Sequence, residues 1–143
     1  MTNFGWAIWR GILGNFQTES TKGTSFMKSF DFPEFIRALP EADLPFSGLR
    51  GWLLQSESGQ VLFMEADVEV MVAQHSHGNQ WGIVINGKID LTIGNDFRTY
   101  TSGETYVIPN GTPHHARIHS GFRAIDYFVD RNRYRTRSHD KRQ

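Results

Sequence analysis

The sequence contains no cysteine, which excludes disulfides, zinc–thiolate sites and thiol nucleophiles. It has no run of about 18 or more apolar residues, so no transmembrane helix is predicted. Fifteen basic residues balance fifteen acidic residues, and this zero net charge favours neither nucleic acid nor an anionic membrane as a partner. Any metal ligands must come from histidine, aspartate, glutamate or glutamine. The lack of cysteine also fits a reducing compartment, and we expect a cytoplasmic protein.

The 143 residues suit one domain with a real core, but the first 26 do not resemble part of it. Residues 1–26 combine aromatic residues, glycines and a polar run without helix or strand periodicity. The apolar stretch near the start has no preceding basic residue and no cleavage pattern, which argues against a signal sequence. Two interpretations stay open: residues 1–26 precede a natural start at Met27, or they form an arm that contributes to a dimer.

Residues 27–48 predict a short helix and a lead-in to the core. Pro33 is placed as a first-turn residue and Pro40 as the stop. The apolar residues that would share one helical face are Phe32, Phe35, Ile36 and Leu39. The sequence therefore predicts a single short helix ahead of the core domain.

Residues 49–130 predict an all-β domain. Short apolar runs alternate with turn residues about every ten positions, and no long helix interrupts them, which favours a small antiparallel β-barrel. Asn86-Gly87 predicts a two-residue hairpin in which both residues have positive φ, and Gly94-Asn95 and Ser120-Gly121 predict similar turns. The candidate strands are residues 49–55, 60–66, 68–77, 81–85, 88–93, 97–101, 104–109, 115–119 and 122–129.

The stretch QHSHGNQWG places two histidines one residue apart. In a strand, His75 and His77 would point to the same face and could offer two imidazoles to one ion. Two surface histidines beside a loop would give the same pattern. The pair alone therefore leaves metal binding and surface exposure both open.

Two longer sequence patterns favour metal binding by these histidines over simple surface exposure. The first runs H-x-H, then Gln80, then six residues and Gly87. The second has Gly103, five residues, Pro109-Asn110-Gly111, two residues and His114. Together they resemble the two motifs of the cupin family over about residues 49–129.

The resemblance implies a jelly-roll-like cupin barrel in which one divalent metal ion is held by His75, His77, Gln80 and His114. Cupins commonly form homodimers, so a homodimer is expected. The sequence departs from the family at Gln80, where most members have glutamate, and the preceding gap is one or two residues shorter. His115 and His119 fall outside the motifs and are interpreted as surface or supporting residues, and His139 as solvent-exposed in the tail.

The neutral ligand set implied by the resemblance has chemical consequences. Without a carboxylate the ion keeps its full charge of two, which favours an anionic small-molecule ligand and argues mildly against ferrous dioxygen chemistry. A Lewis acid that polarises a carbonyl, with a nearby proton carrier, suits this set better. Histidine and amide ligands suit manganese, iron, nickel and zinc alike, so the identity of the metal stays open.

Asp126 is the candidate proton carrier. It lies in an apolar strand and shares a face with Ala124 and Phe128. If that face lines the barrel, burial would raise the pKa of Asp126; if it faces outward, Asp126 is an ordinary solvent-exposed residue. The pattern Asp126-x-Phe128 followed by arginines, with the Gln80 stretch, also resembles the small cupins that convert unsaturated uronates in pectin and alginate breakdown.

The candidate substrate-binding residues are Phe128, Trp81 and Arg117. Trp81 adjoins the predicted ligands and would wall the pocket or pack the barrel. Arg117 is one of several arginines that could grip a carboxylate; the others are Arg50, Arg98 and Arg123. Each could equally face solvent from its strand.

The C-terminal residues 131–143 hold six of the fifteen basic residues. They contain one aromatic residue and no regular basic stripe, which favours a solvated tail over a nucleic-acid-binding arm. The sequence as a whole predicts a metal-dependent Lewis-acid enzyme of isomerase, tautomerase or lyase type. A non-catalytic binding or sensing module and an iron-dependent dioxygenase are the alternatives.

Overall fold

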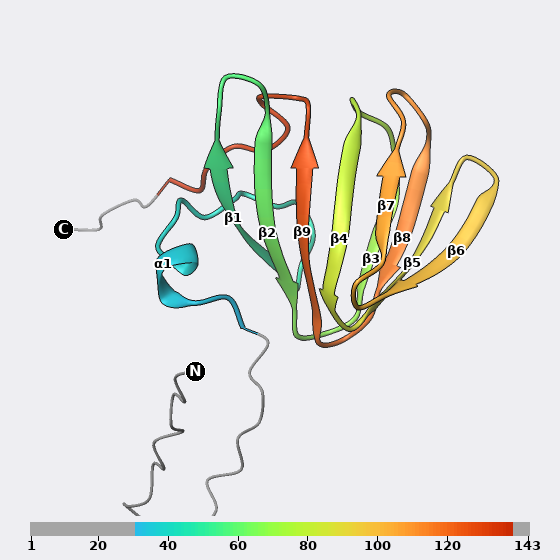
Figure 1. Cartoon of the computed structure of the whole chain (residues 1–143), viewed down its shortest axis with the longest axis horizontal. Helices are drawn as coiled ribbons and strands as arrows, with labels where there is room; N and C mark the ends of the chain where they lie inside the picture. The colour runs from blue at the N-terminus through green and yellow to red at the C-terminus, as the bar shows by residue number, and fades with distance from the viewer. Residues whose placement is uncertain (1–30, 139–143) are drawn as a thin grey trace, which may run out of the picture.

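The structure, a computed structural model, describes residues 31–138. In this range the chain forms nine strands and one helical turn (Figure 1). The elements are α1 (Glu34–Arg37), β1 (Leu49–Gln55), β2 (Gln60–Ala66), β3 (Val70–His75), β4 (Gln80–Asn86), β5 (Lys88–Ile93), β6 (Asp96–Thr101), β7 (Thr105–Ile108), β8 (His114–Ile118) and β9 (Phe122–Phe128). No helix among residues 31–138 is long and apolar enough to cross a membrane.

The strands form two antiparallel sheets. One has the order β1-β2-β9-β4-β7 and the other the order β3-β8-β5-β6 (Figure 1). Strands that are neighbours in a sheet are mostly distant in sequence, as in a jelly roll. The prediction of an all-β fold with one short helix is confirmed.

Alternation of side chains along the strands builds the core between the sheets. In β9, Phe122, Ala124, Asp126 and Phe128 are buried on the inner face. The inner faces of β2 and β8 contribute further buried apolar residues in the same two-residue period. Asp126 is therefore a carboxylic acid inside an otherwise apolar inner face.

A turn does lie at Asn86-Gly87, but it is not the predicted hairpin. β4 and β5 lie in different sheets, so this turn carries the chain from one sheet to the other instead of closing a hairpin. Gly87 has φ of 76°, but no described residue other than glycine has positive φ, so Asn86 does not. A side chain at Gly87 would meet the backbone of Phe122, so close approach between strands explains the glycine.

Of the other two predicted turns, one is a hairpin and one is not. Gly94-Asn95 joins the paired strands β5 and β6, whose register closes at Ile93 opposite Asp96, so this hairpin is confirmed. Ser120-Gly121 links β8 to β9, which lie in different sheets, so it is not a hairpin. Sequence spacing marked the turns but did not distinguish a hairpin from a crossing between sheets.

The N-terminal helix is shorter than its apolar pattern suggests. It spans Glu34–Arg37, buries none of its residues, and leaves Phe35 73% exposed. Phe32 instead makes the contact with the barrel, packing edge-on against Trp52 and Phe63 at ring distances of 6.4 and 5.5 Å. Of the predicted apolar residues, Phe32, Ile36 and Leu39 are partly buried and Phe35 is not, so the prediction holds only in part. Residues 1–26 lie outside the described residues.

Residues 131–138 of the C-terminal segment contact the barrel at several points, although all of them except Arg133 and Tyr134 are exposed, as expected for a solvated tail. The buried Gln60 side chain binds Tyr134 twice, donating to its carbonyl at 2.9 Å and accepting from its N–H at 3.0 Å. Thr136 forms a β-bridge with Ala42, and Arg137 pairs with Glu41 at 3.0 Å. These contacts return the chain across the barrel and bring Tyr134 into its interior.

Candidate metal centre and pocket

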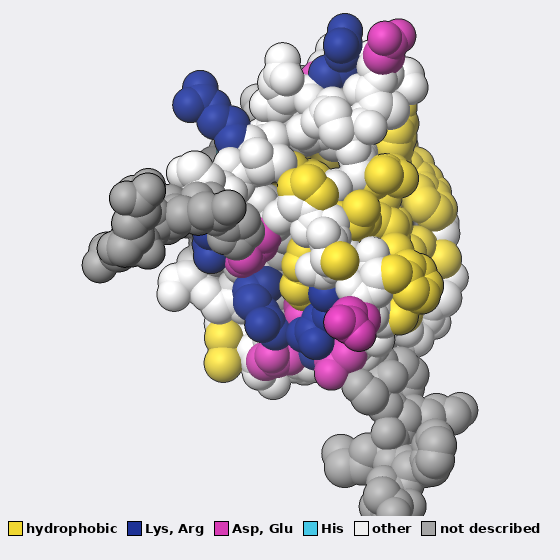
Figure 2. Space-filling view, turned by 90° about the vertical axis from the view of Figure 1, so that its left-hand side faces the viewer, with side chains coloured by type: hydrophobic (Ala, Val, Ile, Leu, Met, Phe, Trp, Pro, Cys, Tyr) yellow, Lys and Arg dark blue, Asp and Glu magenta, His cyan; other side chains and the backbone are white. Residues whose placement is uncertain are grey.

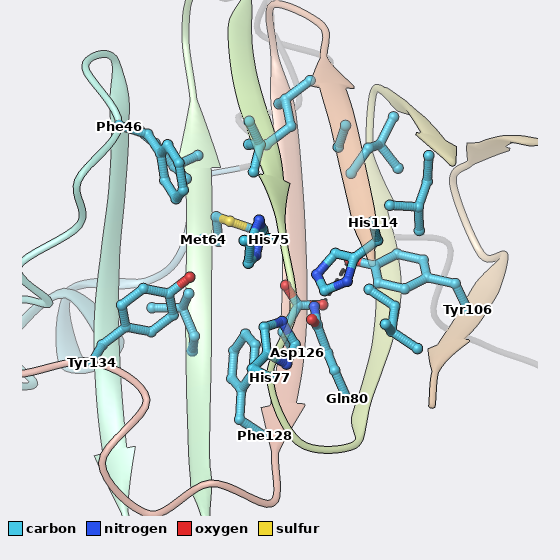
Figure 3. A pocket seen from close by; sticks show the side chains of 18 residues that line it. Phe46, Met64, His75, His77, Gln80, Tyr106, His114, Asp126, Phe128 and Tyr134 are labelled. Atoms are coloured by element: carbon cyan, nitrogen blue, oxygen red, sulfur yellow. Dashed lines mark hydrogen bonds between the residues drawn. The ribbon is translucent and has the colours of Figure 1, made fainter. Parts of the chain in front are cut away.

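Three histidines meet inside the barrel. His75 ends β3, His77 follows two residues later, and His114 begins β8 directly opposite His75 in the strand register. Their ring centroids are 4.3 to 5.3 Å apart, and Figure 3 shows the three rings directed toward a common space. The two predicted motifs therefore converge as expected.

A bulge in β3 is what turns His75 inward. Val70 and Val72 point into the barrel, and strict alternation would place Gln74 inward next. The pairing of β3 with β8 instead shifts between Val72 and His75, so Ala73 and Gln74 are both exposed and His75 reaches the inner face. The histidine pair thus depends on this irregularity as well as on its own spacing.

The hydrogen bonds of the three imidazoles fix which nitrogen is free. Nδ1 of His75, of His77 and of His114 each lies 2.8 Å from a backbone carbonyl oxygen, those of Ala73, Gly78 and Thr112 respectively. A carbonyl can only accept, so each Nδ1 carries the proton and donates it. Each neutral ring then keeps the lone pair of Nε2 for a ligand, the arrangement found in metal-bound histidines.

Burial also holds two of these rings in the neutral form that binds metal. Desolvation, with smaller contributions from the neighbouring His75 and His77, lowers the pKa of His114 to about 4. Desolvation likewise lowers the pKa of His77, with a smaller effect from the positive charge of Arg133. Neutral imidazoles at physiological pH need not lose protons before they bind a cation.

These residues fit one divalent cation. One ring nitrogen from each histidine lies within 4.8 Å of those of the other two. Imidazole nitrogens suit zinc, iron, nickel and manganese. The donor set and the fixed tautomers therefore support a possible three-histidine metal site.

Gln80 and Asp126 lie beside the histidines, as Figure 3 shows. Gln80 begins β4 and is buried, and Asp126 lies on β9 with 1% exposure. Tyr106 on β7 donates its hydroxyl proton to Oδ1 of Asp126 at 2.6 Å. Of the two orientations considered for Asp126, the inward one is confirmed.

Burial raises the pKa of Asp126 to about 7. Desolvation disfavours the carboxylate, while hydrogen bonds from Tyr106 and Gln80 act in the opposite direction and lower the pKa. Burial and the nearby Asp126 carboxyl raise the pKa of Tyr106, so Tyr106 stays a proton donor. The pair gives the pocket a carboxyl group that can hold or release a proton near neutral pH.

The pocket around these groups is mostly apolar. It has an empty volume of about 480 Å³, counted with its open mouth. Phe128 packs on His77 at 5.5 Å between ring centroids, and Phe46, Met64 and Tyr134 form further parts of the wall (Figure 3). The prediction that Phe128 lies at the site agrees with this position.

Two predicted substrate-binding residues lie elsewhere. Trp81 points outward from β4, 42% exposed, on the opposite face from Gln80, so it neither walls the pocket nor packs the core. Arg117 points outward from β8 and pairs with Glu69 at 2.7 Å. Strand alternation explains both positions, because each is one residue away from an inward-facing neighbour.

The other histidines and arginines considered from the sequence also lie outside the pocket. His119 pairs with Asp90 at 2.7 Å and His115 is exposed, while His139 lies outside the described residues. Arg98 pairs with Glu104 at 2.7 Å. Arg50 and Arg123 share Glu65 at 3.0 Å each on the outer side of β2.

Sequence reasoning missed Tyr106, Tyr134 and Arg133. Tyr106 is two residues from Ile108 on an inward face, so the period of β7 could have identified it. Tyr134 and Arg133 belong to a segment without strand periodicity, and no local pattern predicts that it returns to the pocket. Arg133 lies over the Tyr134 ring at 4.5 Å, and its charge affects both His77 and His114.

Comparison with known proteins agrees with the geometry. Residues 59–128 match the family model described as "Cupin domain", and no curated protein matches the chain. An RmlC-like cupin from Shewanella frigidimarina has 22% identity over 70% of this chain and 88% of its own, with a TM-score of 0.58. KdgF from Halomonas sp. has 20% identity over 61% and 84%, with a TM-score of 0.55.

A third structure, oxalate decarboxylase from Bacillus subtilis with its Mn(II) centres, has 19% identity over 59% of this chain and 26% of its own, with a TM-score of 0.54. At these identities the likeness concerns the fold. The matched model, the two histidine motifs and the two-sheet barrel together show that the chain belongs to the cupin superfamily.

Proposed function

We propose that the protein is a divalent-metal-dependent enzyme that moves a proton on a small anionic carbonyl or sugar-acid substrate. The observation that carries the proposal is the position of Asp126, a buried carboxyl group in the wall of the pocket that also holds the three histidines. A purely structural role would not require an acid there, because burying an ionisable group is unfavourable.

His75, His77 and His114 would hold the ion through Nε2, and Gln80 would be the fourth ligand. An ionised Asp126 can only accept hydrogen bonds, so Gln80 would offer it the amino group and leave Oε1 for the ion. When bound, the ion supplies Lewis-acid polarisation of a carbonyl or enol oxygen. Manganese, iron, nickel and zinc all suit this ligand set.

Asp126 would serve as the general acid or base. Its pKa of about 7 lets it take a proton from carbon or oxygen and return it without leaving the neutral range. Tyr106 holds the carboxyl group through Oδ1 and Gln80 also donates to it, and the remaining lone pairs of the carboxylate are available to the substrate. The apolar walls exclude water and would protect the proton from exchange with solvent.

Arg133 is our candidate for attracting the substrate anion. Its Nε is buried without a hydrogen-bond partner, and none of the ion pairs among residues 31–138 involves it. It is not part of the pocket lining, but its charge reaches His77 and His114. Its positive charge would attract a carboxylate to the pocket mouth.

The first test is conversion of an unsaturated uronate monomer, the substrate class suggested by the local resemblance around Gln80 and Asp126. Separate preparations with manganese, iron, nickel or zinc would be followed by proton NMR. We expect conversion to a keto acid, lost in Asp126→Asn while metal content is kept. Equal turnover by that variant would contradict the proposed role of Asp126.

The same preparations separate the alternatives. Metal-dependent binding of uronates or other small organic acids without turnover would favour the binding or sensing module. Oxygen uptake by the iron form with an organic acid would favour dioxygenase chemistry. Metal binding lost in His114→Ala is common to all three, so it tests the site and not the reaction.

A further inference from the structure

The polar side chains that line the pocket already have a partner or a proposed role, with the exception of Tyr134. The histidines and Gln80 would hold the ion, and Asp126 is bonded to Tyr106. Tyr134 forms its hydrogen bonds through its backbone, and its hydroxyl has no partner within residues 31–138. A hydroxyl in an apolar wall is unfavourable unless a ligand or a water completes its hydrogen bonding. Tyr134 is therefore a candidate contact for the ligand.

The hydroxyl of Tyr134 faces the same space as the Asp126 carboxyl group. Figure 3 shows the Tyr134 ring across the pocket from His114, with its hydroxyl oxygen directed inward. Burial raises the pKa of Tyr134; the charge of Arg133 acts against this shift and the charge of Asp126 acts with it. The hydroxyl is thus protonated at neutral pH and can donate a hydrogen bond into the pocket.

The chain around Tyr134 is held so that the ring has little freedom. The buried Gln60 side chain binds the carbonyl and the N–H of Tyr134, and it also donates to Oε1 of Gln55 at 2.7 Å. Gln55 in turn donates to the carbonyl of Arg131 at 2.9 Å. The Tyr134 ring packs edge-on against Phe128 at 5.5 Å between centroids. A donor fixed in this way needs little ordering when a ligand binds, which favours selectivity.

A positive charge lies next to the same ring. The guanidinium of Arg133 is 4.5 Å from the centroid of the Tyr134 ring, and its Nε is buried without a hydrogen-bond partner. A hydroxyl donor beside a cation favours a negatively charged acceptor over a neutral one. A carboxylate carries one charge, whereas a phosphate monoester carries nearly two and costs more to bring into an apolar pocket. A carboxylate is therefore the acceptor that suits this position.

The arginines on the β1 side of the molecule do not offer a similar position. Arg37 and Arg50 each lie 3.0 Å from the carboxylate of Glu65. Figure 2 shows basic and acidic side chains gathered together on this side. Because these charges already neutralise one another, a carboxylate would gain less there than beside Arg133 and Tyr134.

We propose that Tyr134 is a specificity-determining residue that donates a hydrogen bond from its hydroxyl to the carboxylate of a small organic acid. The inference rests on the proposed function for the other end of the substrate, whose carbonyl or hydroxyl oxygen would lie at the histidines. Asp126 would then face the carbon atoms between the two ends. A neutral sugar of the same size has no charged acceptor for Tyr134 and should bind less tightly.

Isothermal titration calorimetry on the zinc-loaded full chain tests the inference without turnover. The probes are D-galacturonate and D-galactose, which differ in a carboxylate against a hydroxymethyl group. We expect the wild type to bind galacturonate at least about tenfold more tightly than galactose. Tyr134→Phe should weaken galacturonate binding about ten- to a hundredfold and leave galactose binding unchanged, because it removes only a hydrogen bond to a charged acceptor.

Tyr127→Phe is the matched control for the loss of a hydroxyl. Tyr127 lies on the outer face of β9 and donates to the carbonyl of Ser58 at 2.8 Å, so galacturonate binding should stay as in the wild type. Equal metal content and melting temperature in the two variants would show that both fold.

Several results would overturn the inference. They are a wild type that does not bind galacturonate or binds galactose as tightly, a Tyr134→Phe variant that binds galacturonate as tightly as the wild type, and an equal loss in Tyr127→Phe. Tighter binding of D-galactose 6-phosphate would also overturn it, because the site would then belong to phosphate.

The proposed reaction is tested separately, by turnover in Asp126→Asn. Galacturonate binding that is lost in Tyr134→Phe, in a wild type that converts no unsaturated uronate, would support the role of Tyr134 and contradict the reaction. Conversion by the wild type with unchanged binding in Tyr134→Phe would have the opposite meaning.

Discussion

Tyr106 and Asp126 are joined by a 2.6 Å hydrogen bond that passes across the strand between them. Tyr106 lies on β7 and Asp126 on β9, and Gly82 of β4 is the register partner of both. A Cβ at position 82 would overlap the Asp126 carboxyl group and the Tyr106 ring. The buried acid therefore depends on a residue without a side chain at one position of the sheet.

Gly82→Ala should displace this pair without introducing backbone strain, because Gly82 does not have positive φ. We expect a loss of stability of about 1–3 kcal/mol from overpacking and a loss of any activity that needs Asp126. Thermal unfolding and metal analysis would measure the effect, and metal should be retained because the histidines lie outside the overlap. A double variant Gly82→Ala/Tyr106→Leu should recover part of the lost stability, and failure to do so would contradict this account.

Tyr106→Phe should raise the pKa of Asp126 further. The variant removes the hydroxyl that lowers this pKa and keeps the ring contact with Tyr100 at 5.3 Å. Loss of a hydrogen bond to a charged acceptor corresponds to an upward shift of roughly one to two pKa units. Carbon-13 NMR titration of the aspartate carboxyls would report it. Tyr100→Phe is the control and should leave the titration unchanged; an unchanged Tyr106→Phe titration would refute the coupling.

Much of the barrel could be predicted from the sequence because it follows local periodicity, and the histidine cluster could be predicted from the two motifs. The bounds of β1, β2 and β5 agree with the predicted runs, since strand alternation and turn residues mark them. The motif around His75 and His77 and the motif ending at His114 converge as predicted. The inward position of Asp126 follows from the alternation of β9, once the inner face is known.

The predictions that failed share one physical cause. Each depends on contacts between segments that are distant in sequence. Asn86-Gly87 has the composition of a hairpin, but its flanking strands find partners in different sheets. Trp81 is next to Gln80 in sequence and on the opposite face in space. Tyr134 reaches the pocket through contacts with residues distant in sequence, among them the Gln60 side chain. Long-range contacts of this kind leave no local signature.

His114→Ala should abolish metal binding, and His115→Ala should not. The two residues are adjacent on β8, but His114 is buried with its Nδ1 fixed by Thr112, while His115 is exposed on the outer face. Removing one of three imidazole ligands should lower the metal affinity by at least about a hundredfold, more than the loss of a supporting residue. Plasma mass spectrometry of the purified variants would measure the metal content. Equal metal in both variants would contradict the proposed site.

Asp126→Asn should stabilise the metal-free protein near neutral pH. The pKa of Asp126 is about 7 in the folded chain and near 3.8 when exposed, so unfolding releases a proton between these values. The contribution of Asp126 to wild-type stability should therefore fall as pH rises from about 4 to about 7 and then level off, while the lowered pKa values of His114 and His77 act in the opposite direction in both the wild type and the variant. The variant lacks this proton release, and its advantage should grow over the same interval to on the order of 4 kcal/mol.

Asp90 lies on the outer surface, and Asp90→Asn should change the stability in the opposite direction from Asp126→Asn. Hydrogen bonds from Thr99 and His119 lower the pKa of Asp90, so its ionised form stabilises the fold above the ordinary aspartate pKa, and this stability is lost as pH falls. This variant should thus be less stable than the wild type at neutral pH. Chemical denaturation at a series of pH values would compare the three proteins without metal. The contrary result is a difference in the free energy of unfolding between Asp126→Asn and the wild type that does not change with pH. That result would show that Asp126 is ionised in the folded chain throughout. It would remove the basis for the role of Asp126 as a proton carrier near neutral pH.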